Sequence, residues 1–132
     1  ESVCTYYKNR FNVDLSSNEV MSLYGSQEGL AHIGLSLCNK GDIVLVPNPG
    51  YPIFEIGPYL SGAEIIHYPL LSENNYIPDL KNIDEDILYK TKFMVVSYPL
   101  NPVCAIAPPD FYDELIKFAK KYNIIIIHDN VE

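Results

Sequence analysis

Short apolar runs, rich in β-branched residues, alternate along this chain with longer stretches of helical periodicity. The runs are bounded by Gly, Pro, Asn or Ser, and we interpret them as strands at residues 20–24, 43–46, 63–67, 93–97 and 124–127. The last of them consists of four consecutive isoleucines, which predicts a strand that is fully buried. The run at 43–46 is expected to break at Pro47.

Helical periodicity fills the spaces between these runs. It predicts helices or helix ends at residues 2–11, 30–38, 53–60, 84–89 and 108–122. In the second of these segments apolar residues recur on two faces, so we expect a largely buried helix that ends at Gly41. The last helix shows one apolar stripe, with acidic residues early and lysines late, as the helix dipole favours.

Strands that alternate with helices indicate βαβ crossovers and therefore a mainly parallel sheet. Both faces of such a sheet are covered by helices. The sequence thus predicts the α/β class, as a three-layer α/β/α arrangement. No repeat, low-complexity tract or linker divides residues 1–132, so they form one α/β unit.

Composition narrows the range of functions. The 132 residues include 9 Lys+Arg and 17 Asp+Glu, which gives a formal net charge of −8. A chain without basic clusters is a poor partner for nucleic acid, whose phosphates require Lys and Arg. The apolar runs are far shorter than the roughly 20 residues that span a membrane. We therefore expect a cytoplasmic globular chain that has neither a nucleic-acid partner nor a membrane segment.

Cys4, Cys38 and Cys104 lie far apart in the sequence and lack the spacing of metal ligands. An odd number of isolated cysteines favours a reducing compartment and free, buried thiols. We predict no metal site.

We looked for ligand-binding residues directly after the predicted strands, because ligands of open α/β sheets bind beyond the carboxyl ends of the strands. Ser26 and Gln27 would open a helix there, and their N–H groups attract phosphate, although Gly-Ser is also a common helix cap. Tyr51 could stack on an aromatic ring or simply anchor a turn, and Asn101 could be part of a plain turn. Asp129 emerges from the isoleucine run, where a carboxylate needs a cation unless it caps a following helix. Together these residues describe a pocket for a flat, anionic heteroaromatic ligand.

Four short motifs follow one another along the chain: Gly-Ser-Gln-Glu-Gly at 25–29, Pro-Gly-Tyr-Pro at 49–52, Tyr-Pro-Leu-Asn-Pro at 98–102 and His-Asp-Asn at 128–130. In this order and at these separations the chain resembles the class I/II aminotransferases, which are pyridoxal-phosphate (PLP) enzymes of fold type I. The segments GSQEGLAHI and PNPGYPIFE are most similar to the LL-diaminopimelate aminotransferase branch.

The resemblance implies a role for each residue. Ser26 and Gln27 would hold the cofactor phosphate, and Tyr51 would stack on the pyridine ring. Asn101 would bind the ring hydroxyl oxygen, and Asp129 would keep the ring nitrogen protonated. The parent protein would be a homodimer of amino-acid metabolism that moves an amino group between an amino acid and a 2-oxo acid.

The chain departs from the family pattern at two positions. Asn-Pro-Thr-Gly becomes Asn101-Pro102-Val103-Cys104, and Glu132 stands where the family has a tyrosine.

None of the lysines matches the Schiff-base lysine motif of the family, so we expect no catalytic residue within residues 1–132. The chain begins with Glu1 and stops directly after its most hydrophobic run. We expect the N-terminal part of a PLP-binding large domain, cut from a longer protein and inactive by itself. A PLP-dependent C–S/β-lyase, a non-catalytic effector-binding module of the PLP fold and a domain for another phosphorylated ligand are the alternatives.

Overall fold

The computed structural model describes residues 1–130 and contains one four-stranded, fully parallel sheet with the strand order β2-β1-β3-β4. The helices and strands, with three short 3₁₀ turns between them, follow one another along the chain: α1 (Ser2–Phe11), α2 (Ser26–Leu37), β1 (Ile43–Asn48), α3 (Ile53–Ser61), β2 (Glu64–Pro69), α4 (Glu85–Leu88), β3 (Thr91–Ser97), α5 (Pro109–Tyr122) and β4 (Ile125–Asp129). These elements are close to those that the hydrophobic pattern predicts.

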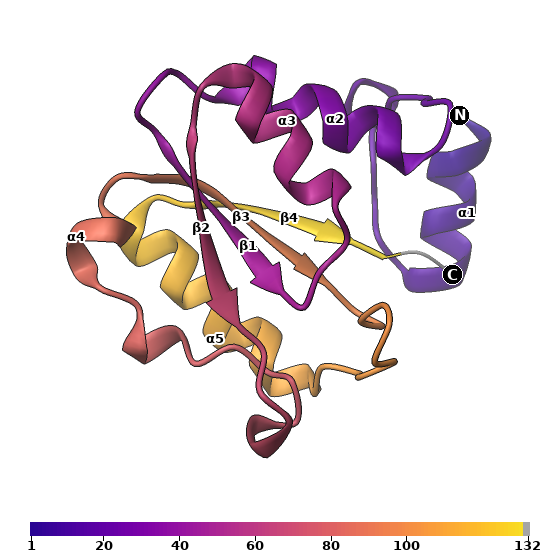
Figure 1. The fold of residues 1–132 in the computed structure, drawn as a ribbon. Helices are drawn as coiled ribbons and strands as arrows, with labels where there is room; N and C mark the ends of the chain where they lie inside the picture. The colour runs from indigo at the N-terminus through magenta and orange to yellow at the C-terminus, as the bar shows by residue number, and fades with distance from the viewer. Residues whose placement is uncertain (131–132) are drawn as a thin grey trace.

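The helices form layers on the two faces of the sheet. Helices α2 and α3 lie over one face and α5 lies under the other, as Figure 1 shows. The alternation of side chains along the strands explains this arrangement, because neighbouring residues point to opposite faces. The predicted three-layer α/β/α class with a parallel sheet is confirmed.

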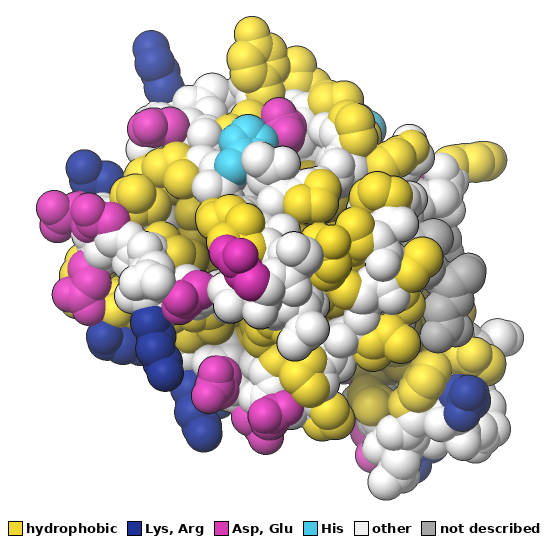
Figure 2. Space-filling view, turned by 60° about the horizontal axis from the view of Figure 1, so that its bottom comes forward, with side chains coloured by type: hydrophobic (Ala, Val, Ile, Leu, Met, Phe, Trp, Pro, Cys, Tyr) yellow, Lys and Arg dark blue, Asp and Glu magenta, His cyan; other side chains and the backbone are white. Residues whose placement is uncertain are grey.

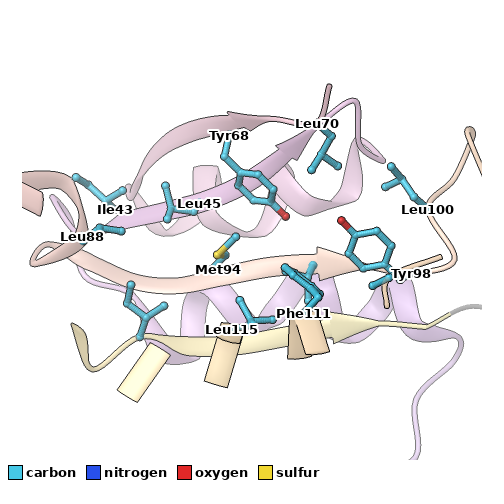
Figure 3. Close-up of a cluster of buried hydrophobic side chains, with 13 residues drawn as sticks. Ile43, Leu45, Tyr68, Leu70, Leu88, Met94, Tyr98, Leu100, Phe111 and Leu115 are labelled. Atoms are coloured by element: carbon cyan, nitrogen blue, oxygen red, sulfur yellow. The ribbon is translucent and has the colours of Figure 1, made fainter. Parts of the chain in front are cut away.

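Two separate hydrophobic clusters fill the spaces between the layers. Leu45 and Met94 belong to the cluster on the α5 side, which Figure 3 shows between the sheet and that helix. Val44 and Phe93 point to the other face and pack under α2 and α3. Each of these four side chains is at least 99% buried. The central strands β1 and β3 are thus buried on both sides, as a parallel sheet requires.

The chain changes direction between β1 and β3. After β1 it crosses over to β2 on one side, and after β3 it crosses over to β4 on the other side. The paired register of β1 and β3 ends at Leu45 and Met94, so the two strands diverge toward their carboxyl ends. The buried Tyr68 hydroxyl donates a hydrogen bond of 2.6 Å to the Val95 carbonyl just beyond the last pair. This divergence is a topological switch point, where α/β sheets bind ligands.

Two glycines bring α2 and α3 into backbone contact. A Cβ atom on Gly34 would lie 2.6 Å from the carbonyl carbon and oxygen of Gly57. A Cβ on Gly57 would lie 2.5 Å from the Leu30 carbonyl oxygen. Because neither glycine has a Cβ, the two helices pack closely against each other.

The sequence prediction was wrong in three of these segments. Residues 20–24 form no strand, because no strand of the described sheet lies beside them to supply hydrogen bonds. Helix α2 ends at Leu37, well before Gly41, and it is only partly buried, since its Leu35 side chain is 55% exposed. Strand β1 continues through Pro47 to Asn48.

The isoleucine run is also less buried than predicted. Strand β4 forms an edge of the described sheet, and its Ile125 side chain is 42% exposed, whereas Ile124, just before the strand, is buried. The three cysteines are free, but Cys4 and Cys38 are half-buried and Cys104 is exposed, so the prediction of buried thiols was wrong.

The surface carries the negative charge that the composition predicts. On the face shown in Figure 2, acidic and apolar side chains intermingle, while Lys and Arg lie around its edge. In the part of the chain that the structure describes, no helix is long and apolar enough to cross a membrane. Nor do residues 1–130 contain a cluster of three or more metal-ligating side chains.

Candidate functional site

A cavity of about 290 Å³ opens at the carboxyl end of the sheet, at the switch point between β1 and β3. All five residues predicted from the sequence line it, although they come from four separate segments of the chain. The lining consists of Ser26, Gln27, Leu30, Tyr51, Ile53, Phe54, Ser97, Pro99, Asn101 and Asp129. The structure therefore brings the candidate residues together.

The amino end of α2 supplies the groups that suit an anion. Gly25 precedes the helix with a φ of 82°, a conformation that costs glycine nothing, and Ser26 and Gln27 are the first two helical residues. N–H groups at this end of a helix lack intrahelical acceptors and carry its positive dipole. The nearby Glu28 carboxylate already accepts a hydrogen bond of 2.6 Å from the Tyr24 N–H.

Tyr51 lies on the turn between β1 and α3 and presents an aromatic ring to the cavity. The ring packs edge-on against Phe54, with centroids 6.4 Å apart and planes inclined by 70°. The Gln27 amide Nε2 donates a hydrogen bond of 3.2 Å to the Tyr51 hydroxyl, and Tyr51 remains 43% exposed. A flat ligand could therefore stack on an exposed ring face.

Asn101 lies in the tight loop that follows β3. Leu100 and Ala105 form an isolated antiparallel bridge, and the Cys104 N–H donates a hydrogen bond of 2.6 Å to the Leu100 carbonyl. Cys104 adopts a φ of 55°, in the left-handed region that favours glycine. The loop thus keeps a glycine-type turn where the sequence has replaced glycine with cysteine.

Asp129 ends β4 and pairs in register with Ser97 at the end of β3, so both side chains face the cavity. Burial raises the pKa of the Asp129 carboxyl above its ordinary value. Within residues 1–130 this carboxylate has no ion-pair partner. His128 points to the other face of β4, and its ring lies 5.6 Å from that of Tyr112. The cavity thus contains a carboxylate that a cationic ligand would stabilise.

Half of the lining was missed by the sequence analysis. Ser97 is 94% buried, and its hydroxyl forms no hydrogen bond with another described residue. Strand alternation could have identified it, because it lies two residues after Val95 on the same face. The other four are apolar wall residues that lie within the quoted segments but were given no role there: Leu30, Ile53, Phe54 and Pro99. Glu132 lies outside the described residues.

An α/β sheet with a cavity at its switch point, lined by the amino end of a helix and a half-buried carboxylate, is typical of cofactor-binding α/β domains. The profile of the aminotransferase class I and II family matches residues 1–131. The chain belongs to this family, whose members are PLP-dependent enzymes.

Known proteins resemble this chain over nearly its whole length. It is 51% identical to the LL-diaminopimelate aminotransferase of Halothermothrix orenii over 130 residues, which are 98% of this chain and 33% of that protein. The LL-diaminopimelate aminotransferase of Aquifex aeolicus is 47% identical, with 98% and 34% covered. Substrate-bound BacF from Bacillus subtilis superposes with a TM-score of 0.92 at 40% identity, covering 97% of this chain and 33% of its own. The chain thus spans about a third of these relatives.

The donor groups around the cavity fit the family's cofactor. PLP combines a phosphate, a flat aromatic ring, a ring hydroxyl and a basic ring nitrogen, and the lining offers a helix amino end, an aromatic face, an amide and a carboxylate. Neither lysine nor arginine lines the cavity in the described part of the chain. The described residues therefore provide polar and aromatic contacts for such a cofactor but no Schiff-base amine.

Proposed function

We propose that residues 1–132 form the N-terminal part of the PLP-binding domain of an aminotransferase that moves an amino group between an amino acid and a 2-oxo acid. One observation carries this proposal: five residues chosen from sequence motifs, on four segments of the chain, line a single cavity. Family membership and the switch-point position of the cavity support it.

Each side chain then has a physical task. The amino end of α2 at Ser26 and Gln27 binds the phosphate through N–H groups and a hydroxyl. Tyr51 covers a face of the ring and excludes water from it. Asn101 donates an amide hydrogen bond to the ring oxygen. Asp129 holds a proton on the ring nitrogen, and when bound in this state PLP supplies an electron sink for substrate carbanions.

The longer protein would have to supply the remaining groups. None of the lysines in the described part of the chain lines the cavity, so the covalent attachment and the proton transfer at the substrate carbon require a lysine elsewhere. We propose that the 132-residue chain binds the cofactor weakly and does not catalyse transamination. This chain covers about a third of the length of its relatives, which supports the proposal that the remaining groups come from elsewhere in a longer protein.

Three finer features belong to the same proposal. The relatives named LL-diaminopimelate aminotransferases, at 41–51% identity, make LL-diaminopimelate the first amino acid to test with the complete protein. The free cysteines are in keeping with a cytoplasmic protein. A homodimer is expected from the family, and sedimentation of the complete protein tests it.

Binding of pyridoxamine 5′-phosphate tests the proposal on the chain itself. This form of the cofactor has an amine in place of the aldehyde, so it forms no imines with surface lysines. We expect weak binding that Asp129→Asn reduces by about tenfold or more, because a charged hydrogen-bonded pair is lost. Asp113→Asn, on the exposed surface of α5, is the control. Equal binding by the Asp129→Asn variant and the unchanged chain would refute the role of Asp129.

A further inference from the structure

The Gln27 side chain is hydrogen-bonded to another residue that lines the cavity. Its amide Nε2 donates a hydrogen bond of 3.2 Å to the Tyr51 hydroxyl, across 24 residues of sequence. The residue therefore has two separable parts: a backbone N–H at the amino end of α2, and a side chain committed to an aromatic ring.

We propose that Gln27 is a positioning residue that holds the Tyr51 ring against the cavity, while only its backbone N–H takes part in anion binding. This inference rests on the proposed cofactor-binding function and deepens it. It assigns to the Gln27 side chain a role in ring stacking that is independent of the phosphate.

The surroundings of Tyr51 explain why such a tether is needed. Tyr51 is 43% exposed, and its ring has an edge contact with Phe54. A tyrosine side chain that is partly exposed has more than one staggered rotamer open to it. The hydrogen bond from Gln27 fixes the far end of the ring and so removes this freedom before a ligand arrives.

The tether can act only if its two ends keep a constant separation. Gln27 is the second residue of α2, and Tyr51 lies two residues before the first residue of α3. The backbone contact between Gly34 and Gly57 locks these helices together. The packing of α2 on α3 therefore sets the distance between Gln27 and Tyr51, and the hydrogen bond between them holds the ring.

Three probes separate the two parts of Gln27. Inorganic phosphate requires only the anion-binding end of α2, pyridoxamine requires only the ring contacts, and pyridoxamine 5′-phosphate requires both. Gln27→Ala keeps the backbone N–H and removes the tether, whereas Tyr51→Phe keeps the ring and removes the hydroxyl. Tyr59→Phe, at a 74% exposed position of α3, is the matched control.

In the 132-residue chain, we expect Gln27→Ala to weaken pyridoxamine binding by about three- to tenfold and to leave phosphate binding unchanged. Tyr51→Phe should have the same effect, and the double variant should be no worse than either single variant, because one hydrogen bond is lost in all three. Aromatic NMR signals of Tyr51 in the unliganded chain should shift in Gln27→Ala and stay unchanged in Tyr59→Phe.

Two results would overturn the inference while leaving the proposed function intact. One is pyridoxamine binding by Gln27→Ala that equals that of the unchanged chain. The other is an equal loss of phosphate and pyridoxamine binding, which would make the Gln27 side chain a phosphate ligand. Failure of the unchanged chain to bind pyridoxamine 5′-phosphate would instead refute the proposed function, and the positioning role would fall with it.

Discussion

Replacing Gly34 with alanine tests the helix contact that supports the site. The added Cβ would lie 2.6 Å from the backbone carbon and oxygen of Gly57 and 2.7 Å from the Pro58 nitrogen. Favourable contacts between carbon atoms occur at about 3.5–4.0 Å. Because these neighbours are backbone atoms that cannot rotate away, α2 must move away from α3 by about 1 Å.

The expected loss of stability follows from two opposing terms. Overpacking of this kind costs about 1–3 kcal/mol, and a backbone clash belongs at the upper end of that range. Alanine regains up to about 1 kcal/mol through its higher helix propensity. We therefore expect the free energy of unfolding to fall by about 2 kcal/mol, which for 132 residues lowers the melting temperature by about 7 °C.

Gly29→Ala in the same helix is the matched control. Its Cβ would meet, at 2.7 Å, only the end of the Leu23 side chain, which is 43% exposed and can swing aside. This variant should be neutral or up to about 1 kcal/mol more stable than the unchanged chain. Urea unfolding followed by circular dichroism measures both variants. Equal stability of Gly34→Ala and Gly29→Ala would refute the account of the helix contact.

Three further predictions follow from buried or strained groups. Tyr68→Phe should lower the free energy of unfolding by about 1–3 kcal/mol, because the buried Val95 carbonyl loses its donor; an effect in urea unfolding no larger than that of Tyr59→Phe would contradict this. Cys104→Gly should raise the melting temperature by relieving about 1 kcal/mol of left-handed strain, and a lower melting temperature would show that the cysteine side chain is needed there. Burial raises the pKa of Asp129, so the folded chain binds the extra proton and loses stability as pH rises through the window between the unfolded and folded pKa values. Asp129→Asn should therefore be more stable than the unchanged chain in urea at pH 7, and this advantage should vanish below the unfolded pKa of about 3.9; a constant difference across this range would exclude titration of Asp129 as its cause.

Local patterns predicted most of the fold, because alternation and helical periodicity are properties of neighbouring residues. The strand that begins at Ile43 and the helix at 108–122 were correctly located because their patterns are long or strongly apolar, although the strand extends to Asn48. Residues 20–24 were wrongly assigned, since an apolar run becomes a strand only beside a partner that the described sheet does not provide. The exposure of Ile125 could not be predicted either, because it depends on the position of β4 at the edge of the described sheet.

Part of the candidate site could be predicted from the sequence and part could not. Motifs located the turns that carry Ser26, Tyr51 and Asp129, and the rule for carboxyl ends of parallel strands brought them to one edge. The hydrogen bond from Gln27 to Tyr51 could not be predicted, because it depends on how closely α2 packs on α3. That packing depends on the contact of Gly34 in α2 with Gly57 in α3, and the sequence pattern of each helix alone does not show which of its residues meets the other helix.

The central claim is that this cavity binds the PLP cofactor, and amide chemical shifts of the 132-residue chain test it most directly. Titration with pyridoxamine 5′-phosphate should shift the N–H signals of residues 25–28 together with those of Tyr51, Asn101 and Asp129, and the rest of the chain should change little. Shifts centred on the other side of the sheet, around Glu73 and Glu114, or no shifts at all, would contradict the assignment of this site.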